Sequence, residues 1–377
     1  MKKVVVGVSG GVDSAVTALL LKQKGYDVQG VFMKNWDTGE ETGVCTTSKD
    51  LEDAKWMCDQ IKIPFREVNY VKHYWNDVFS HLVSGYQKGL TPNPDILCNR
   101  NVKFNHFLNY ALNDLQADAV ATGHYARTTF GPYLENYQPD TDVHLLEAFD
   151  KTKCQAFFLC GIRQKSLRRI MFPLGELRKV DVKEIARNSG LVRLAKKKES
   201  MGICFIGKRH FQDFIAEYVN HIPGNFIDVD TGKVVGTHNG IHMWTIGQRT
   251  NLSGFSKAYF ILKKISPDIL VAAGTDHPRL HTKFVLSHEP NWICHEPLEL
   301  TKNKILECYF RFQHTKPLIP CRIVKYSVNK LFIMLEKSAR AITPGQYAVF
   351  YKDGECLGGA QIIGPGPSDI YFNGEEL

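Results

Sequence analysis

The segment that most constrains this chain is GVSGGVDS at residues 7–14, which directly follows the valine-rich run at residues 4–6. A β-branched run that passes into paired glycines and then into SAVTALLL predicts a buried strand, a tight turn and a helix. Gly10 and Gly11 can adopt backbone angles that other residues avoid, so several N–H groups can converge on one anion. The positive end of the helix macrodipole strengthens that attraction.

The side chains of this loop predict a polyphosphate site. Ser9 and Ser14 supply hydroxyl donors, and Asp13 is suited to a magnesium ion carried by a phosphate. The segment lacks the lysine of G-x-x-x-x-G-K-[ST] and the spacing of G-x-G-x-x-G, which argues against a P-loop and against a dinucleotide site. A plain tight turn is the structural alternative.

Strand-like and helix-like patterns alternate through the first two hundred residues. Strands are predicted at 4–8, 26–33, 64–70 and 117–123, and helices at 14–24, 48–63, 74–89 and 102–116. This alternation is typical of βαβ units on a parallel sheet, an α/β Rossmann-like fold whose ligands bind at the carboxyl edge. Both SGGVDS and TGHYAR fall at that edge.

The pattern changes after about residue 210. One amphipathic helix is predicted at 210–224, followed by short strands with glycine turns, and from about residue 283 by the pattern of a small β-barrel. We therefore expect a catalytic domain at 1–210, a small, mostly-β central domain at 211–282, and a C-terminal β-barrel domain at 283–377.

Charge is concentrated in one segment. The chain has 47 Lys and Arg against 39 Asp and Glu, but residues 151–210 alone hold 16 basic and 4 acidic residues. Such a segment favours a polyanionic partner, most often nucleic acid, with a solvated helical face as the alternative. No apolar run approaches the roughly 18 residues of a membrane span, so no membrane partner is expected.

Ten cysteines are scattered without a C-x-x-C pair, which argues against a disulfide scaffold and a four-thiolate zinc site. Two of them lie in polar, basic settings. Cys98 lies in PNPDILCNRNVK, just before the helix expected from Val102, and Cys204 lies in KKKESMGICFIGKR. Basic neighbours favour the thiolate form, although an ordinary buried thiol is the alternative at each position.

A pair of reactive thiols in the same chain as a polyphosphate loop suggests sulfur transfer, although the separation of 106 positions between Cys98 and Cys204 does not show that the two thiols are close in space. One thiolate can carry a terminal sulfur as a persulfide, and the other can release it by forming a disulfide. Asp95 is the nearest candidate for a general acid or base.

SGGVDS resembles the pyrophosphate loop of the ATP-pyrophosphatases. Together with GLTPNPDILCN, ATGHYAR, GICFIG and TPGQYAVFY, it makes nearly the whole chain resemble the tRNA-specific 2-thiouridylases. The resemblance implies adenylation of the 2-carbonyl oxygen of the wobble uridine in tRNAs for Lys, Glu and Gln, and then sulfur transfer, with ATP and Mg²⁺. The implied ATP contacts are Gly7, Val8, Ser9, Gly10, Gly11, Val12, Asp13, Ser14, Met33 and Gly123.

The resemblance also implies the RNA contacts. Asn93, Pro94 and Asp95 would touch the target uridine, while Cys98 would be the nucleophile and Cys204 the persulfide carrier, with a transient disulfide between them. The other implied tRNA contacts are His124, Lys153, Cys154, Gln155, Arg311, Phe312 and Gln346. Cys154 stands where the family usually has Asp, which favours a neutral packing role there. The ring faces of Tyr125 and Phe312 are suited to stacking on bases.

The implied partners are the tRNA anticodon stem-loop and an upstream persulfide donor. KNWDTGEETGVCT and KKESMGICFIGKR look most like the mitochondrial branch, so the mitochondrial matrix is expected, with bacterial cytoplasm as the alternative. Two rival functions are a small-molecule ATP-pyrophosphatase synthetase and a non-enzymatic, ATP-gated tRNA-binding module. The sequence leaves open the sulfur donor's identity, the choice between monomer and dimer, and any cleaved presequence.

Overall fold

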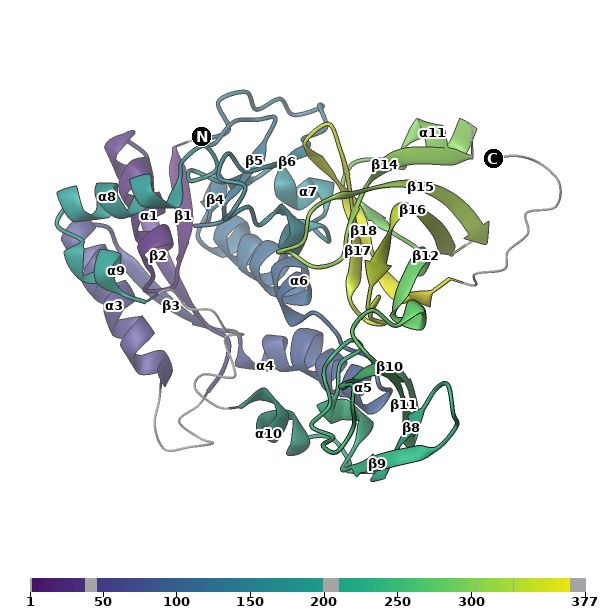
Figure 1. The fold of residues 1–377 in the computed structure, drawn as a ribbon. Coiled ribbons are helices and arrows are strands. Elements are labelled where there is room, and N and C mark those ends of the chain that lie inside the picture. The colour runs from purple at the N-terminus through teal and green to yellow at the C-terminus, as the bar shows by residue number, and fades with distance from the viewer. Residues whose placement is uncertain (1, 38–45, 199–209, 303, 328, 367–377) are drawn as a thin grey trace.

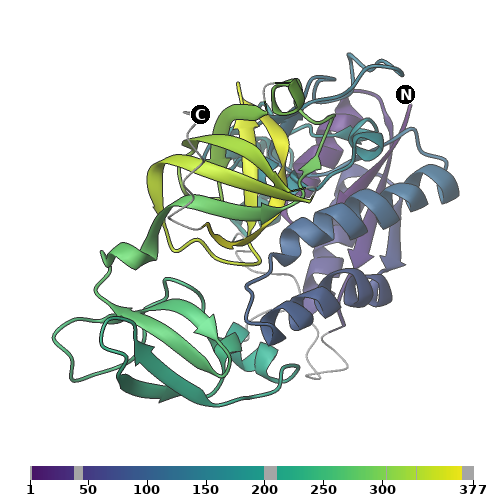
Figure 2. The ribbon, with the colours of Figure 1, turned by 90° about the vertical axis from the view of Figure 1, so that its right-hand side faces the viewer.

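The computed structural model describes residues 2–37, 46–198, 210–302, 304–327 and 329–366 (Figure 1). A parallel sheet, a small antiparallel-rich sheet and a barrel follow one another along the chain, and Figures 1 and 2 show them as three groups of strands. Among the described helices, none is both long and apolar enough to cross a membrane.

The first sheet has five strands in the order β3-β2-β1-β4-β7, and every neighbouring pair is parallel. The α/β parallel-sheet fold predicted from the alternating pattern is therefore confirmed. The strands are β1 (Lys3–Val8), β2 (Asp27–Lys34), β3 (Phe65–Asn69), β4 (Ala119–Ala121) and β7 (Ile170–Met171).

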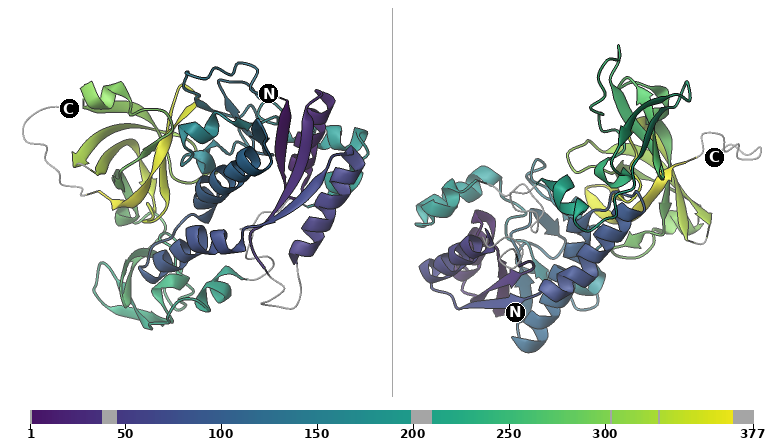
Figure 3. Two further views of the ribbon diagram at one scale, coloured as in Figure 1. Left: turned by 180° about the vertical axis from the view of Figure 1, so that it is seen from behind. Right: turned by 90° about the horizontal axis from the view of Figure 1, so that it is seen from below.

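Helices cover both faces of this sheet because successive side chains of a strand point to opposite sides. Val4 and Val6 of β1 pack into the core cluster that contains α1, whereas Val5 packs with Phe107 on the other face. The first face carries α1 (Val12–Gln23), α3 (Thr46–Ile61), α8 (Lys179–Asn188) and α9 (Val192–Lys196). Figure 3 shows this layering from behind.

Two long helical runs form the second face. The first is α4 (Val71–Tyr74), η1 (Trp75–Phe79) and α5 (Ser80–Gln87). The second contains α6 (Pro94–Leu97), η2 (Cys98–Phe107) and η3 (Tyr110–Asp114). The second run begins eight residues before the start predicted at Val102, and this difference changes the setting of Cys98.

The middle of the chain forms a four-stranded sheet in the order β10-β11-β8-β9. Its elements are α10 (Phe211–Ala216), β8 (Gly224–Asp228), β9 (Val234–His238), η5 (Ile241–Met243), β10 (Tyr259–Ile265) and β11 (Asp268–Ala273). The single helix predicted at 210–224 is wrong in length, because α10 ends at Ala216 in i→i+3 turns. Phe214 and Val219 pack into the core beside the parallel sheet, and this packing favours a turn over a longer helix.

The last part of the chain is a closed six-stranded barrel, as predicted. It closes because β12 pairs with both β16 and β18. Its elements are η6 (Pro278–Leu280), β12 (His281–His288), β13 (Asn291–Trp292), α11 (Leu298–Lys302), β14 (Ile305–Arg311), β15 (Ile319–Ser327), β16 (Lys330–Arg340), β17 (Tyr347–Lys352) and β18 (Glu355–Pro365).

The barrel and the parallel-sheet region share a core. Between β4 and β7 the chain forms β5 (Ala126–Thr128), β6 (Leu145–Glu147), η4 (Ala156–Leu159) and α7 (Gln164–Leu167). Strand β6 pairs with β18 of the barrel, and the Glu147 N–H donates to the Gly354 carbonyl at 2.9 Å. Val349, Tyr351 and Cys356 of the barrel belong to the same core cluster as α1.

Candidate active site

The glycine loop between β1 and α1 has a shape that only glycine permits. Gly10 has a φ of +68°, and a Cβ there would lie 2.3 Å from the carbonyl oxygen of Asp50. Gly11 is the N-cap of α1 and has no side chain to cap the helix, so its first N–H groups have no side-chain acceptor among the described residues. This arrangement fits the predicted phosphate site.

The two serines of the loop differ in what they bond. The buried Ser14 hydroxyl accepts from the Ser9 N–H at 3.1 Å and donates to the Gly11 carbonyl at 3.1 Å, so it braces the turn. The Ser9 side chain is exposed, with its Oγ 3.3 Å from that of Ser14. Ser9 is therefore the hydroxyl that remains open to a phosphate.

Asp13 is bonded to a lysine from a distant helix. Its two carboxylate oxygens each accept from Lys179 Nζ at 2.6 Å, and Oδ1 also accepts from the Tyr125 hydroxyl at 2.9 Å. The Asp13 carboxylate can bind a magnesium ion only if the Lys179 ammonium moves away, because the ion and the ammonium are both cations that bind the same oxygens.

A second lysine reaches the loop from the end of α9. Lys197 Nζ donates to the Gly10 carbonyl at 3.1 Å and to the Asp50 and Asp53 carboxylates at 2.7 and 2.6 Å. Arg193 also pairs with the buried Asp53. A lysine of the basic segment therefore lies at the loop, although the loop motif itself contains none.

Sequence analysis missed Lys179, Lys197 and the hydroxyl role of Tyr125. The sequence did contain one signal. The phosphate loop has no lysine of its own, and a strongly basic segment occurs later in the chain. That coincidence, however, does not select particular lysines from the 16 basic residues between 151 and 210.

Gly123 and Met33, two of the implied ATP contacts, lie beside the loop. A Cβ on Gly123 would be 2.8 Å from the Asp13 carbonyl carbon and the Ser14 nitrogen, so the strand end after β4 packs directly on the start of α1. Met33 Cε and Phe107 Cε1 each lie 3.3 Å from the Cβ position of Gly7. The end of η2 therefore contacts the beginning of the loop.

His124 is buried rather than surface-exposed. It is 8% exposed, bonds to the Thr122 hydroxyl at 2.7 Å through Nδ1, and contacts the rings of Phe104 and Phe172. Burial, with a smaller contribution from Lys103, holds the pKa of His124 well below 6.5. The imidazole is therefore neutral at pH 7, and an RNA contact by its side chain requires this packing to open.

Cys98 lies inside a helix, not in an extended loop before one. The Asn93 side chain accepts from the Ile96 N–H at 3.3 Å and caps a helix whose first residue is Pro94. Asn at the N-cap and Pro at N1 are the usual start of a helix, and this was the missed signal. Cys98 is 5% exposed and belongs to a hydrophobic cluster, so the alternative of a buried thiol describes its setting in this structure.

Asp95 and Cys98 are three residues apart on this helix and therefore share one face. The Asp95 side chain reaches solvent, but protein surrounds it at longer range. The resulting desolvation raises the pKa of its carboxyl, and the charge of Lys103 opposes this rise. Asp95 holds a proton more readily than an ordinary carboxyl, by an amount that solvent access limits.

Two predicted RNA contacts from distant parts of the chain meet at the start of α6. Asn93 Nδ2 donates to Gln346 Oε1 at 3.4 Å, and Gln346 Nε2 donates to the Thr91 carbonyl at 2.8 Å. The barrel therefore holds the segment that precedes Cys98.

Other predicted RNA contacts are packed inside the protein. Phe312 is 5% exposed and stacks on Phe310, and Tyr125 is 3% exposed, so neither ring face is open to a base in this conformation. Arg311 lies over the Tyr351 ring, 5.3 Å from its centroid, with Glu147 3.9 Å away.

The predicted trio 153–155 lies against Tyr125. Gln155 Oε1 accepts from the Tyr125 N–H at 3.0 Å, and Lys153 is half-buried. Cys154 is 2% exposed and its sulfur accepts from the Ala148 N–H, while burial raises the pKa of its thiol. This supports the packing role expected for Cys154. Cys204 and its pairing with Cys98 lie outside the described residues.

Comparison with known proteins assigns the family. The model described as "tRNA methyl transferase HUP domain" matches residues 2–208, "tRNA methyl transferase PRC-barrel domain" matches 212–272, and "Aminomethyltransferase beta-barrel domain" matches 282–362.

Three curated relatives are similar over nearly their full length, and each is named mitochondrial tRNA-specific 2-thiouridylase 1. The Drosophila melanogaster protein is 52% identical, covering 97% of this chain and 95% of its own. The Gallus gallus protein is 47% identical over 97% and 93%, and the Homo sapiens protein is 46% identical over 98% and 92%. This chain belongs to the tRNA-specific 2-thiouridylase family.

Proposed function

We propose that this protein uses ATP to replace the 2-carbonyl oxygen of the wobble uridine with sulfur in tRNAs for Lys, Glu and Gln. The relatives' shared name supports the reaction class. The structural observation that carries it is one helical run with Asp95 and Cys98 near its start and Phe107 against Gly7 at the loop. Nine residues of helix place the thiol on the order of 10 Å from the phosphate loop.

In this proposal ATP is the co-substrate that activates the carbonyl oxygen by adenylating it. Loop residues Gly7 to Ser14, with Met33 and Gly123, contact ATP, and Lys179 and Lys197 add positive charge beside its phosphates. Mg²⁺ accompanies ATP, and its binding at Asp13 requires the Asp13–Lys179 ion pair to open.

Sulfur transfer then follows from two thiols. Cys204 carries the terminal sulfur as a persulfide, which forms a bond to the activated carbon as AMP leaves. The Cys98 thiolate attacks the Cys204 sulfur, so a Cys98–Cys204 disulfide forms and the terminal sulfur stays on the uridine. Asp95, near Cys98 with a raised pKa, serves as the general acid or base.

The RNA partner in this proposal is the anticodon stem-loop. Asn93, Pro94 and Asp95 touch the target uridine, and His124, Lys153 to Gln155, Arg311, Phe312 and Gln346 provide further contacts. The relatives' name supports a mitochondrial location, and we extend this to the matrix, with an upstream persulfide donor there. The chain divides into domains at about residues 210 and 282.

The test is the content of 2-thiouridine in tRNA. Cells that carry only Cys98→Ser or Cys204→Ser should lack the modified nucleoside by mass spectrometry, while the purified variants still bind tRNA. Persistent 2-thiouridine in both variants would refute the two-thiol mechanism and favour a non-enzymatic tRNA-binding module.

A second measurement addresses the substrate class. Purified protein supplied with ATP and sulfide should thiolate an anticodon stem-loop with a wobble uridine. Release of pyrophosphate with a small-molecule acceptor and no RNA would instead support the rival synthetase.

A further inference from the structure

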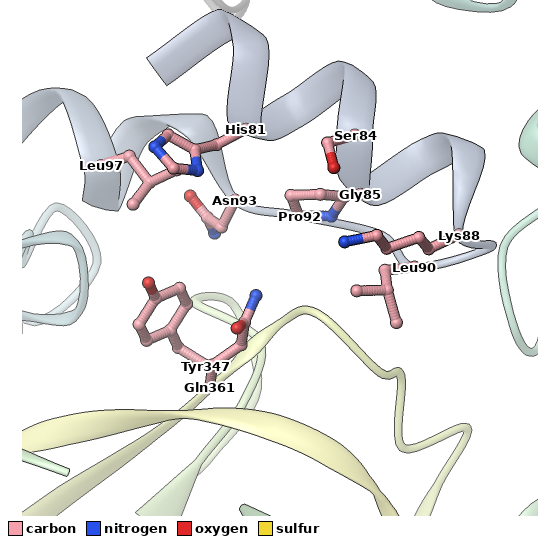
Figure 4. Close-up of a pocket in the computed structure, with 10 residues that line it drawn as sticks. All are labelled: His81, Ser84, Gly85, Lys88, Leu90, Pro92, Asn93, Leu97, Tyr347 and Gln361. Atoms are coloured by element: carbon pink, nitrogen blue, oxygen red, sulfur yellow. The ribbon is translucent and has the colours of Figure 1, made fainter. Parts of the chain in front are cut away.

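A pocket of about 240 Å³ lies between the parallel-sheet region and the barrel, next to the start of α6 (Figure 4). Its walls come from α5, from the segment that leads into α6, and from strands β17 and β18. The lining residues are His81, Ser84, Gly85, Lys88, Leu90, Pro92, Asn93, Leu97, Tyr347 and Gln361. Its volume is below the roughly 300 Å³ at which pockets for drug-sized ligands begin, so it suits a smaller group.

One wall is a regular stripe of a helix. His81, Ser84, Gly85 and Lys88 recur at i, i+3, i+4 and i+7, so they share one face at the end of α5. A Cβ on Gly85 would lie 2.3 Å from Pro92 Cγ, so glycine lets the segment before α6 pack tightly on α5. The wall is therefore a packed surface that holds its shape.

The opposite wall belongs to the barrel. Tyr347 and Gln361 are directly paired across β17 and β18, and Figure 4 shows both facing Asn93 and Lys88 across the pocket. In the part of the chain that the structure describes, the side chains of His81, Lys88 and Tyr347 have no hydrogen-bond partner. Burial raises the pKa of Tyr347 to about 12, so its hydroxyl is a donor at neutral pH.

The chemistry of this lining favours a nucleotide. Its polar groups are two amides, a hydroxyl, a phenol, an imidazole and an ammonium, and no carboxylate is among the described lining residues. Amides bond the edges of unstacked RNA bases, aromatic rings stack on them, and lysine pairs with phosphate. A cationic small molecule would find no counter-charge here.

The pocket and the nucleophile lie on different faces of α6. Asn93 and Leu97 line the pocket, whereas Cys98 is about 100° around the helix from Leu97 and Asp95 is about half a turn from it. The thiol therefore lies within about one helix diameter, roughly 10 Å, of the pocket, and unstacked neighbouring nucleotides in a loop can bridge that separation.

We propose that this pocket binds the base of the nucleotide that directly neighbours the target uridine in the anticodon loop, with Gln361 bonding its edge, Tyr347 contacting its ring and Lys88 pairing with its phosphate. The inference rests on the proposed function and deepens it. The pocket thereby selects the RNA loop and helps to splay the target uridine toward Cys98.

The experiment combines RNA and protein changes. Wild-type protein is assayed for thiolation of an intact anticodon stem-loop and of two loops with an abasic nucleotide, one 5′ and one 3′ of the target. We expect one abasic loop to lower kcat/KM by about tenfold, since a stacked base contributes about 1–3 kcal/mol.

Ser84→Trp fills the pocket from α5, and Gln87→Trp is the matched control, because Gln87 is exposed on the same helix and does not line the pocket. Ser84→Trp should lower kcat/KM for the intact loop by about tenfold, and the abasic change should then lower kcat/KM no further. Gln87→Trp should behave as wild type. Lys88→Ala should weaken binding of all three loops, whereas Lys72→Ala, an exposed lysine on α4, should not.

Equal activity of wild type on all three loops would overturn the inference while leaving the proposed function intact. So would a full abasic penalty in Ser84→Trp, because the two losses would then be independent. If wild type does not thiolate even the intact loop, the proposed function fails, and this inference fails with it.

Discussion

At Gly10 both the backbone angle and a neighbouring carbonyl exclude any side chain. Its φ is +68° and a Cβ would lie 2.3 Å from the Asp50 oxygen, whereas Gly25 has a φ of +85° with nothing within 4 Å of the Cβ position. Gly10→Ala should therefore shift the loop and lower kcat/KM for ATP on the order of 100-fold. Gly25→Ala should cost only about 1 kcal/mol of stability from backbone strain and leave the kinetics unchanged.

ATP-dependent pyrophosphate release measured on both variants decides the matter. Equal kinetics in the two alanine variants would show that the contact with the Asp50 carbonyl, and hence the loop's exact shape, does not matter for ATP.

His124 gives the protein a pH dependence of known sign. The folded state holds the pKa of His124 well below 6.5, so the unfolded state binds a proton that the folded state does not. The stability from the neutral imidazole is full above the unfolded pKa of about 6.5 and is lost as the pH falls below it.

Between about pH 7 and pH 5, the Tm of wild type should therefore fall more steeply than the Tm of His124→Gln. The pKa values of His238 and His242 are also lowered by burial, so only the difference between proteins is diagnostic. The control is His288→Gln, at an exposed histidine, and its Tm should fall with pH as steeply as that of wild type. Parallel curves for wild type and His124→Gln would contradict the neutral, buried state.

Local sequence predicted some of these residues and not others. The glycine loop carries its own conformational signal, so the prediction of a phosphate site at Gly10, Gly11 and Asp13 needs only the motif. Lys179 and Lys197 carry no such signal, because nothing local separates a lysine that reaches 166 positions back to Asp13 from one that faces solvent. The burial of Phe312 depends in the same way on the closing of the barrel.

At the scale of single elements, the short helix α6 depends on one capping side chain. Asn93 Oδ1 accepts from the Ile96 N–H at 3.3 Å, and Asn93 Nδ2 donates to Gln346 at 3.4 Å. Asn93→Ala should lower the free energy of unfolding by about 1 kcal/mol because it removes the cap, whereas Asn93→Asp keeps an acceptor and should lose less than about 0.5 kcal/mol.

Urea denaturation of the three proteins measures this difference. A loss in Asn93→Asp as large as that in Asn93→Ala would mean that the bond to Gln346, rather than the cap, holds the start of the helix.

Element boundaries were predicted less well than element types. The strands at 4–8 and 64–70 agree with β1 and β3 to within one residue, because periodicity and flanking turns coincide there. By contrast, the sequence pattern predicts a helix that starts only at Val102, after Cys98. Asn93 and Pro94 instead act as cap and first residue, so the same residues start the helix earlier.

At the scale of the whole molecule, the barrel is joined to the parallel-sheet region more closely than sequence indicated. The pairing of β6 with β18 joins residues about two hundred positions apart, at Leu146 and Glu355. Short strands of three residues carry almost no periodic signal, so this junction could not be predicted. It fixes Gln346 beside Asn93 and so builds the pocket between the two regions.

Charge pairing across the molecule changes how the basic segment acts. In the described structure, the basic side chains that pair with carboxylates include Lys151, Arg168, Arg178, Lys179, Arg193 and Lys197. These groups serve the fold and the phosphate loop. The exposed Arg163 and Lys165 have no carboxylate partner among the described residues and remain available for RNA phosphates.

The salt dependence of tRNA binding separates these two groups. Each phosphate contact contributes about 0.7–0.9 to the slope of log K against log salt, because it releases condensed counterions. The double variant Arg163→Met/Lys165→Met should therefore lower the slope by about 1–2, whereas Lys197→Met should leave it unchanged while weakening ATP binding. Filter binding of tRNA across a salt series gives the slopes, with circular dichroism as the check on folding. A slope in Lys197→Met as low as that of the double variant would show that the paired lysines leave their carboxylates to contact RNA.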